Sequence, residues 1–470
     1  MSKWSEVALL SVRELRELLK ARKLSPVELV KACLGQVEEW NAEVNALVTL
    51  STDLLSDARE AEAAIMRQED LGVLHGIPIG IKEVTPVRGI RTTYGSLVYK
   101  DYVPKQDALV VSRFRRAGAI ILGKTNASEF AAGANTYNEV FGSTRNPWNS
   151  NLTSGGSTGG GAAGLATGMF AIAEGTDLGG SLRIPAAFCG VVGLRPSPGL
   201  IPTSPSDYLW DTLQVTGPMV RSADDLPLVL EALAGPSSDC PISGWAPQKD
   251  FVAKCTEEIP LKGLSLAYSP DIAGIGVDSD IEDSCRRCVI GLEGLGVRIN
   301  ETALDLSEGR DAFAALRGHW MLSHHLGRLE HLESFGPNLA GNIRFGLEQD
   351  PKALGEAERT RSIIWKTFSK IFQKNQFLLT PTVVVPPFLS EQNYPESING
   401  NKMETYIDWI APTFLTSLPG LPVVSVPCGV DARGLPVGIQ IVGSPHDEVG
   451  VIKLAKVIQN MCPVPLPSKP

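Results

Sequence analysis

Lys82 is a residue of this sequence with unusual potential for acid–base chemistry. It ends the apolar run Ile77–Ile81, which places its amine at the end of a strand inside the core. Burial lowers the pKa of a lysine from about 10.4 by up to ~3–5 units, so the neutral amine can accept a proton near pH 7. The simpler interpretation is an ion pair between Lys82 and Glu83 or another carboxylate.

Ser181 closes a second segment with chemical potential, the glycine-rich stretch Gly175–Ser181. This stretch follows an expected strand at residues 168–174 and precedes an expected helix at 182–190. A serine at such a junction can present its hydroxyl at a helix N-terminus, where the free amides from Leu178 to Ser181 would form a nest for an anion. Gly179 and Gly180 let the backbone approach a ligand closely, as an oxyanion hole requires.

Ser157 lies in a loop in which five of the seven residues 155–161 are glycine. Residues 155–159 match G-x-S-x-G, the nucleophile elbow of α/β-hydrolases, and His446 lies downstream as that chain order requires. An elbow caps a buried strand, however, and residues 149–156 are mostly turn formers. We therefore interpret the segment as a loop with unusual backbone angles.

Residues 118–125 (GAIILGKT) match the phosphate-binding loop pattern letter for letter. That loop needs backbone N–H groups that curl around a phosphate after a strand ends. Here the intervening AIIL is itself strand-like, and amides paired in a sheet cannot bind a phosphate. The sequence therefore predicts no nucleotide site at this position.

The surrounding elements indicate an α/β layered core, because short apolar runs at 75–83, 118–126 and 168–177 alternate with helical patterns. Residues 1–60 are predicted to be an N-terminal helical segment that packs on the core. Residues 61–470 are predicted to be a single domain with a variable, mainly helical insertion at about 240–370. Strand patterns return from residue 377, and a last helix is expected at 447–461.

The composition argues against two classes of partner, nucleic acid and membrane. The net charge of −9 argues against nucleic acid. No stretch approaches the ~18 uninterrupted apolar residues of a membrane-spanning helix, and the N-terminus acquires charges too early for a signal peptide. We therefore predict a cytoplasmic location, with no membrane partner.

Cysteine and histidine spacing does not predict a metal site. Only Cys285 and Cys288, of eight cysteines, form a C-x-x-C pair, and no second pair stands at ligand spacing. His324 and His325 are adjacent on an expected helix, so they should point to different faces. We expect reduced thiols, no metal and no organic cofactor.

Taken together, these segments resemble the amidase signature family. The glycine- and serine-rich signature is present as residues 154–161 (SGGSTGGG) and 175–187 (GTDLGGSLRIPAA). Similar flanking blocks stand at residues 74–78, 123–126, 146–149, 190–196, 420–422 and 434–440. The resemblance is densest over about 70–225 and 375–460.

The resemblance implies a mixed central β-sheet flanked by helices and a Ser-cisSer-Lys triad. The nucleophile falls on Ser181, the second serine, with a cis peptide bond before it, on Ser157, and the lysine on Lys82. The oxyanion hole falls on the amides of Leu178, Gly179, Gly180 and Ser181. Neutral Lys82 would accept a proton from Ser157, which takes one from Ser181 as that serine attacks an amide carbonyl and forms an acyl-enzyme.

Three further residues are expected to support the loop. Asp177 and Arg183 should pair with one another. Thr158 stands where the family usually has a second serine, and its hydroxyl could still hydrogen-bond to Ser181. Glu83 likewise stands where the family often has aspartate.

Two functions are consistent with the motifs. The first is a free-standing amidase that hydrolyses a small-molecule amide, ester or carbamate, with a homodimer as one possible assembly. The second is the glutaminase subunit of a tRNA-dependent amidotransferase. That subunit commonly has glutamine where this chain has Ile184. Aromatic and histidine residues of the insertion and just beyond it could line an acyl or aryl pocket or pack in helices: His319, Trp320, His324, His325, Trp365, Tyr406 and Trp409.

Overall fold

The computed structural model describes residues 3–69, 71–245 and 250–469 and is built around one large sheet. Its strands are β1 (Leu47–Leu50), β2 (Pro78–Lys82), β3 (Ile120–Thr125), β6 (Ile172–Asp177), β7 (Val192–Arg195), β8 (Val215–Val220), β9 (Ser265–Tyr268), β10 (Arg298–Glu301), β11 (Phe377–Pro381), β14 (Val423–Val430) and β15 (Pro436–Gly443). Two small hairpins lie outside it, formed by β4 (Arg145–Asn146) with β5 (Asn149–Thr153) and by β12 (Ser397–Ile398) with β13 (Asn401–Lys402).

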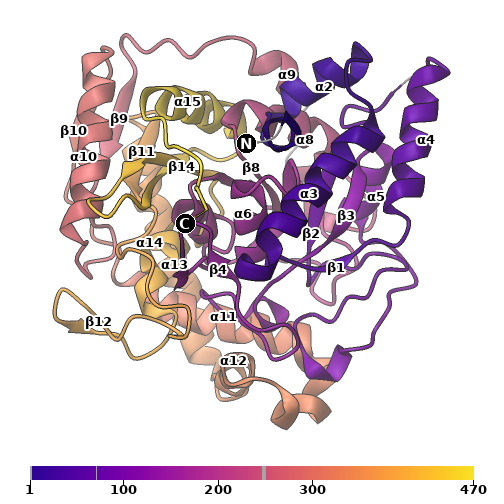
Figure 1. Ribbon diagram of the computed structural model, residues 1–470. Coiled ribbons are helices and arrows are strands. Elements are labelled where there is room, and N and C mark those ends of the chain that lie inside the picture. Colours follow the sequence, from indigo (N-terminus) through magenta and orange to yellow (C-terminus); the bar gives the residue numbers. More distant parts are fainter. Residues whose placement is uncertain (1–2, 70, 246–249, 470) are drawn as a thin grey trace.

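The eleven strands follow the order β1-β3-β2-β6-β8-β7-β14-β15-β11-β9-β10. The sheet is mixed, because β2 runs parallel to β3 and β6, whereas β8 is antiparallel to β6 and β14 is antiparallel to β15. Helices surround the sheet (Figure 1). The predicted α/β class with a mixed central sheet is therefore confirmed.

The α-helices account for most of the remaining regular structure. They are α1 (Lys3–Ala8), α2 (Val12–Lys20), α3 (Pro26–Val44), α4 (Leu54–Met66), α5 (Leu109–Arg116), α6 (Gly159–Ala166), α7 (Arg183–Cys189), α8 (Leu226–Leu233), α9 (Phe251–Lys254), α10 (Ser279–Gly294), α11 (Gly309–His325), α12 (Pro337–Leu347), α13 (Pro351–Phe372), α14 (Ala411–Ser417) and α15 (Glu448–Met461). α3 begins with a capping box, in which the Ser25 and Glu28 side chains each accept a hydrogen bond from the other residue's backbone N–H.

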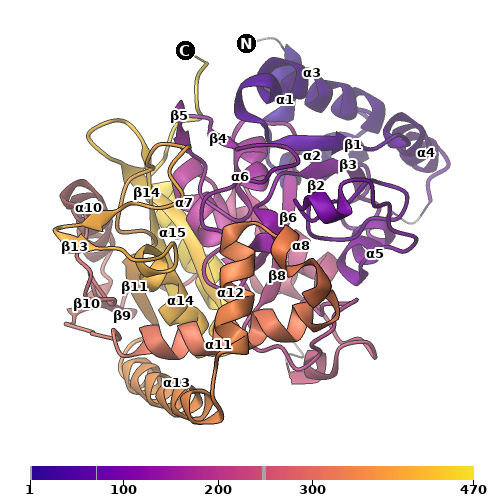
Figure 2. The same cartoon turned by 90° about the horizontal axis from the view of Figure 1, so that it is seen from below.

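The sequence patterns did not predict β7 and β8 of the central sheet, and two further regions contain unpredicted strands. In the N-terminal segment, β1 follows α3 and pairs antiparallel with β3, so this segment contributes to the sheet. In the insertion, β9 and β10 extend the far edge of the sheet, and β9 runs parallel to β11. Each of these strands has four residues, and β10 is largely exposed, so neither an apolar run nor an alternating pattern marks it. The insertion is otherwise helical, from α10 to α13, and α11 and α12 lie against one side of the molecule (Figure 2).

The apparent phosphate-binding loop is a strand, as its composition indicates. Residues Ile120–Thr125 form β3, which is buried throughout and pairs with β1 on one side and β2 on the other. Its amides are therefore oriented toward neighbouring strands rather than curled around an anion. The prediction of no nucleotide site at this position is consistent with this geometry.

The sheet also determines where polar side chains meet. Lys82 is the last residue of β2, and Asp177 is the last residue of β6, the parallel strand beside it. The carboxyl ends of neighbouring parallel strands lie at one edge of a sheet, where ligands of α/β proteins commonly bind. The candidate site lies at this edge.

Candidate functional site

Lys82 and Ser157 form the polar centre of the site. Lys82 is fully buried, and its Nζ is hydrogen-bonded to Ser157 Oγ at 2.8 Å and to Thr176 Oγ1 at 2.9 Å. Burial lowers the pKa of Lys82 to about 7, although the nearby charges of Glu174 and Asp177 favour the ammonium form. The amine can therefore be neutral near pH 7, which a base requires.

The alternative of an ion pair between Lys82 and Glu83 is not found. The Glu83 carboxylate accepts hydrogen bonds from the Thr93 N–H at 2.6 Å and the Thr93 hydroxyl at 2.9 Å. Glu174 accepts a hydrogen bond from the backbone N–H of Lys82 rather than from its amine. Burial raises the pKa of both carboxyl groups. Among the described residues, no carboxylate forms a salt bridge with the Lys82 side chain.

The loop before Ser157 approaches another backbone segment closely. The Gly156–Ser157 peptide bond is cis, as the family resemblance implies. A Cβ atom at Gly156 would lie 2.9 Å from backbone atoms of Ala134 and Asn135, so this position requires glycine. The preceding β5 was expected to be a turn but forms a short hairpin with β4, outside the central sheet. A nucleophile elbow directly follows a strand of the central sheet. Ser157 does not follow such a strand.

Ser181 lies in the loop between β6 and α7 and is only partly buried. The Thr158 N–H donates to the Ser181 carbonyl at 3.3 Å, which joins the two serine loops. The amides of Leu178, Gly179 and Ser181 donate to no other described residue. The Gly180 amide differs from the expectation, because it donates to Asp177 Oδ1 at 2.9 Å. Three of the four expected oxyanion-hole amides therefore have no hydrogen-bond partner among the described residues.

The Thr158 hydroxyl does not support Ser181 in the expected way. Its Oγ1 is buried and has no hydrogen-bond partner among the described residues. Its methyl group instead fills the space beside Gly175, where a Cβ atom would lie 2.6 Å from Thr158 Cγ2. The extra carbon of threonine thus packs against the loop, and the link to Ser181 runs through the backbone.

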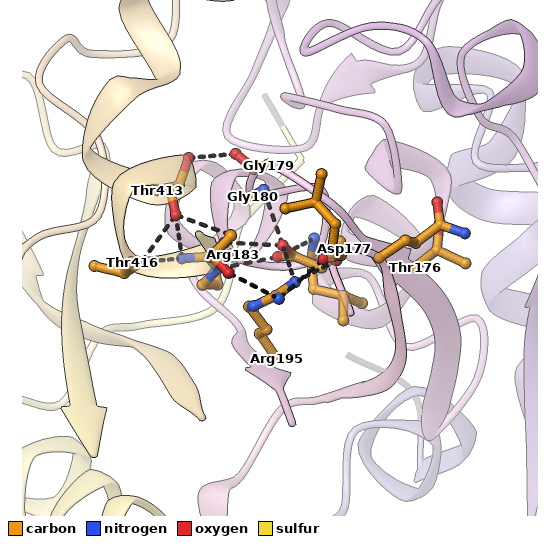
Figure 3. Close-up of polar contacts among 12 residues, drawn as sticks. Thr176, Asp177, Gly179, Gly180, Arg183, Arg195, Thr413 and Thr416 are labelled. Carbon is orange, nitrogen blue, oxygen red and sulfur yellow. Dashed lines mark hydrogen bonds and ion pairs between the residues drawn. The ribbon is translucent and has the colours of Figure 1, made fainter. Parts of the chain in front are cut away.

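Asp177 and Arg183 form the predicted pair at the base of the loop (Figure 3). Arg183 Nη2 donates to Asp177 Oδ1 at 2.8 Å, and both side chains are fully buried. Arg195, which the sequence analysis did not assign to the site, donates to the Asp177 carbonyl at 2.5 Å. Burial opposes the charge of Asp177, but the two guanidinium groups hold its pKa below the usual range. The carboxylate is therefore ionised, and it orders the loop by accepting from the amides of Gly180 and Leu182.

The far side of Arg183 connects the loop to the C-terminal part of the chain (Figure 3). Its remaining donors bind groups on α14 and β15, namely the Thr413 carbonyl, the hydroxyls of Thr416 and Ser417, and Gln440 Oε1. The Thr413 hydroxyl in turn donates to the Gly179 carbonyl at 2.6 Å. Arg195 and Gln440 stand in blocks that resemble the family, but no spacing in the sequence shows that they meet Asp177 and Arg183.

Two cavities flank the segment from Ser128 to Asn135, the same segment that packs on Gly156. A cavity of about 230 Å³ is lined by Phe130, Ala131 and Thr176 among others. A cavity of about 470 Å³ is lined by Ala132, Asn135 and the carboxylates of Glu129, Glu139 and Glu391. Phe130 and Ala131 both have left-handed backbone angles, with φ of 44° and 61°. Each such angle costs about 1–3 kcal/mol, and strain of this kind is concentrated at functional sites.

Of the aromatic and histidine residues in and near the insertion, some line a cavity, some are exposed and some are buried. Trp320, His324 and His325 line the smaller cavity, and the two histidine rings pack on different partners, His324 on Tyr208 and Trp320, and His325 on Phe130 and Phe335. His319 and Trp365 are exposed, whereas Tyr406 and Trp409 are buried.

Outside the site, two cysteine thiols from distant parts of the described chain are neighbours. Cys285 Sγ lies 3.9 Å from Cys428 Sγ, a neighbour that the local C-x-x-C spacing does not reveal. Within residues 3–69, 71–245 and 250–469, no group of three or more His, Cys, Asp or Glu side chains is arranged to hold a metal ion. No helix in the same ranges is long and apolar enough to span a bilayer.

Comparison with known proteins gives one family. The family model described as Amidase matches residues 28–452. The A-type subunit of glutamyl-tRNA(Gln) amidotransferase from Carboxydothermus hydrogenoformans is 32% identical over 482 residues, covering 97% of this chain and 98% of that protein. Its counterpart from Geobacillus kaustophilus is 33% identical, covering 96% of each chain.

Solved structures of similar fold include an aryl acylamidase and an amidotransferase subunit. A bacterial aryl acylamidase of the amidase signature family has a TM-score of 0.90 and 26% identity, covering 98% of this chain and 97% of that one. The A-type subunit of glutamyl-tRNA(Gln) amidotransferase from Thermotoga maritima has a TM-score of 0.79 and 26% identity, covering 98% of each chain.

Proposed function

Because the chain belongs to the amidase family, we propose that it hydrolyses a carboxylic amide through an acyl-enzyme formed on Ser181. The observation that carries this proposal is the 2.8 Å contact between Lys82 Nζ and Ser157 Oγ at the end of two parallel strands. A buried amine whose pKa is near neutrality can take the proton that Ser157 receives from Ser181.

The steps of the reaction follow from this arrangement. Ser181 Oγ attacks the amide carbon while its proton passes to Ser157 and on to Lys82. The oxyanion is bound by the amides of Leu178, Gly179 and Ser181, which have no partner among the described residues. The proton returns through Ser157 to the leaving nitrogen, the C–N bond breaks, and water then hydrolyses the acyl-enzyme.

A second candidate is the glutaminase subunit of a tRNA-dependent amidotransferase. The two curated relatives described above are both A-type subunits with 32% and 33% identity, and they support this candidate more directly than the first. In that case the ammonia would pass to a partner subunit. The higher TM-score to the aryl acylamidase, at equal identity, supports the free-standing enzyme.

The surroundings of Gly179 also support the free-standing amidase. A Cβ atom at Gly179 would meet Phe313 at 3.0 Å and Ile410 and Phe414 at 3.6 Å, so the nearest side chains are all apolar. Glutamine carries an ammonium and a carboxylate group, and buried charges need charged or hydrogen-bonding partners. An apolar acyl group suits these neighbours better.

The two candidates differ in what the isolated chain can do. Purified alone, a free-standing amidase should release amine or ammonia from simple amides with normal turnover. A glutaminase subunit should hydrolyse glutamine, and its rate should rise when the partner subunits are added. Failure of the isolated chain to hydrolyse any member of a panel of aryl, alkyl and primary amides would exclude the first candidate.

Other expectations remain proposals. We propose that the protein works without a metal or organic cofactor, in the cytoplasm, on a small-molecule substrate, and that its assembly is a monomer or a homodimer. Size-exclusion chromatography with light scattering would distinguish the assemblies, and a chelator should leave the rate unchanged.

A further inference from the structure

Four of the eight cysteines form two pairs of thiols that the proposed hydrolysis does not use. Cys285 and Cys288 lie on α10, Cys428 lies on β14, and Cys462 directly follows α15. Cys285 Sγ lies 3.9 Å from Cys428 Sγ, and the thiols of Cys288 and Cys462 are hydrogen-bonded to each other. Because α10 packs against both β14 and α15, each thiol of the C-x-x-C pair has a partner from a distant part of the chain.

The end of α15 lies directly against α10. Met461 is the last residue of α15, and a Cβ atom at Gly291 of α10 would lie 2.7 Å from Met461 Sδ. Gly291 is about one helical turn after Cys288, so the glycine leaves room for the end of α15 beside that thiol. The contact between Cys288 and Cys462 therefore results from the packing of two helices.

The two members of this pair differ in exposure and in proton affinity. Cys462 is partly exposed, whereas Cys288 is 1% exposed. The hydrogen bond from Cys288 lowers the pKa of Cys462, although burial opposes this shift. The hydrogen bond to Cys462, together with burial, raises the pKa of Cys288. Since the thiolate is the nucleophilic form of cysteine, Cys462 is the more reactive thiol of the two.

The second pair is less suited to react with a reagent from solvent. Cys285 and Cys428 are 0% and 3% exposed. Their hydrogen bond raises the pKa of Cys428, and burial raises it further. Among the described residues, the four thiols are not arranged to hold a metal ion together. The chemistry that this cluster favours is therefore bond formation between two sulfurs, beginning at Cys462.

We propose that Cys462 and Cys288 are a redox-active pair that a hydroperoxide oxidises to a reversible disulfide. The Cys462 thiolate attacks one oxygen of the hydroperoxide, the O–O bond breaks, and a sulfenic acid and a hydroxide or alkoxide ion form. The Cys288 sulfur then attacks the Cys462 sulfur, the S–O bond breaks, and the Cys288 proton leaves with the oxygen as water. The two sulfurs together lose two electrons, which the hydroperoxide gains. The new bond joins α10, in the insertion, to the end of α15.

Oxidation of the reduced full-length protein with hydrogen peroxide tests this inference. After the peroxide is removed with catalase and free thiols are alkylated, peptide mass mapping should show a Cys288–Cys462 cross-link and the loss of two thiols. Dithiothreitol should restore both thiols. A Cys285–Cys428 cross-link as the first product would overturn the inference, as would oxidation that dithiothreitol does not reverse. This map needs no variant and does not depend on amide hydrolysis.

Three serine variants test the roles within the pair. Cys462→Ser should abolish the cross-link and slow the first thiol loss by about tenfold or more, because the reactive thiolate is removed. Cys288→Ser should leave a sulfenic acid on Cys462, which dimedone traps, because no thiol is present to displace the oxygen. Cys255→Ser is the control, because Cys255 is also buried and burial raises its pKa to about 11. This control should oxidise like the native protein. Equal rates of thiol loss in Cys462→Ser and native protein would overturn the inference.

Discussion

Lys82 Nζ and Ser157 Oγ lie 2.8 Å apart, although 75 positions separate the two residues in the chain. They meet because β2 ends at Lys82 beside β6, and because the glycine-rich loop bends back over this edge of the sheet. Ser181 follows β6 in the next loop, and the backbone bond from Thr158 to Ser181 joins the two loops.

Ser181→Ala should lower kcat on any amide substrate by about a thousandfold or more, because it removes the nucleophile and only one oxygen atom. The circular dichroism spectrum and the melting temperature should change little. Ser154→Ala is the matched control, since Ser154 is in the neighbouring loop and donates to the Thr144 carbonyl at 3.0 Å. A Ser181→Ala protein that retains several per cent of the native rate would contradict the assignment.

Asp177→Asn should destabilise the protein by about 3–5 kcal/mol, because it leaves the buried guanidinium groups of Arg183 and Arg195 without a counter-charge. Denaturant unfolding measures this difference. Glu333→Gln is the control, because the Arg344–Glu333 pair has a similar distance of 2.7 Å but lies at the surface. Equal effects of the two substitutions would show that the Asp177 network does not stabilise the loop.

Gly180→Ala should impair both folding and activity. Gly180 has φ of 124°, and an added Cβ would lie 2.7 Å from Thr413 Cβ. Gly235→Ala is a matched control with φ of 115° and no atom within 4 Å of the new Cβ. Both substitutions carry a left-handed backbone cost of about 1–2 kcal/mol. Only Gly180→Ala should also lower kcat, by about tenfold or more, since the loop amides move. A Gly180→Ala enzyme with native kcat would indicate that the loop tolerates the shift.

Much of the fold could be predicted from sequence because its signals are local. The buried runs around Lys82, Leu122 and Ala173 are the central strands, and Gly and Pro mark their ends. The strands β1, β7, β9 and β10 were missed because four residues are too few to show a period, and the six-residue β8 was missed as well. Tertiary pairing, rather than local preference, makes them strands.

The residues of the candidate site also fall into two groups: those that a local motif marks and those that only tertiary packing brings together. The three triad residues could be named because each ends or interrupts a recognisable motif. By contrast, the contacts of Arg195 and Gln440 with Asp177 and Arg183 depend on how β7, β15 and α14 pack, and no spacing along the chain encodes them. The Gly180 amide was assigned to the oxyanion hole because sequence shows a glycine but not that Asp177 already accepts its hydrogen bond.

The last prediction concerns pH. Burial lowers the pKa of Lys82 to about 7, so the neutral fraction of this amine rises as the pH rises through that value. If neutral Lys82 is the base, kcat/KM should be low in acid, rise through an apparent pKa near 7, and stay high into mildly alkaline conditions. Lys82→Arg keeps a charge that cannot be lost and should be nearly inactive, and Lys82→Ala should lose the rise itself.

Lys124→Arg controls for the size of a buried arginine, because Lys124 is also fully buried but does not contact Ser157. If Lys82 only anchors the loop as an ammonium, Lys82→Arg should keep substantial activity and the native pH profile. Profiles of kcat/KM for the four proteins therefore distinguish a base from an anchor.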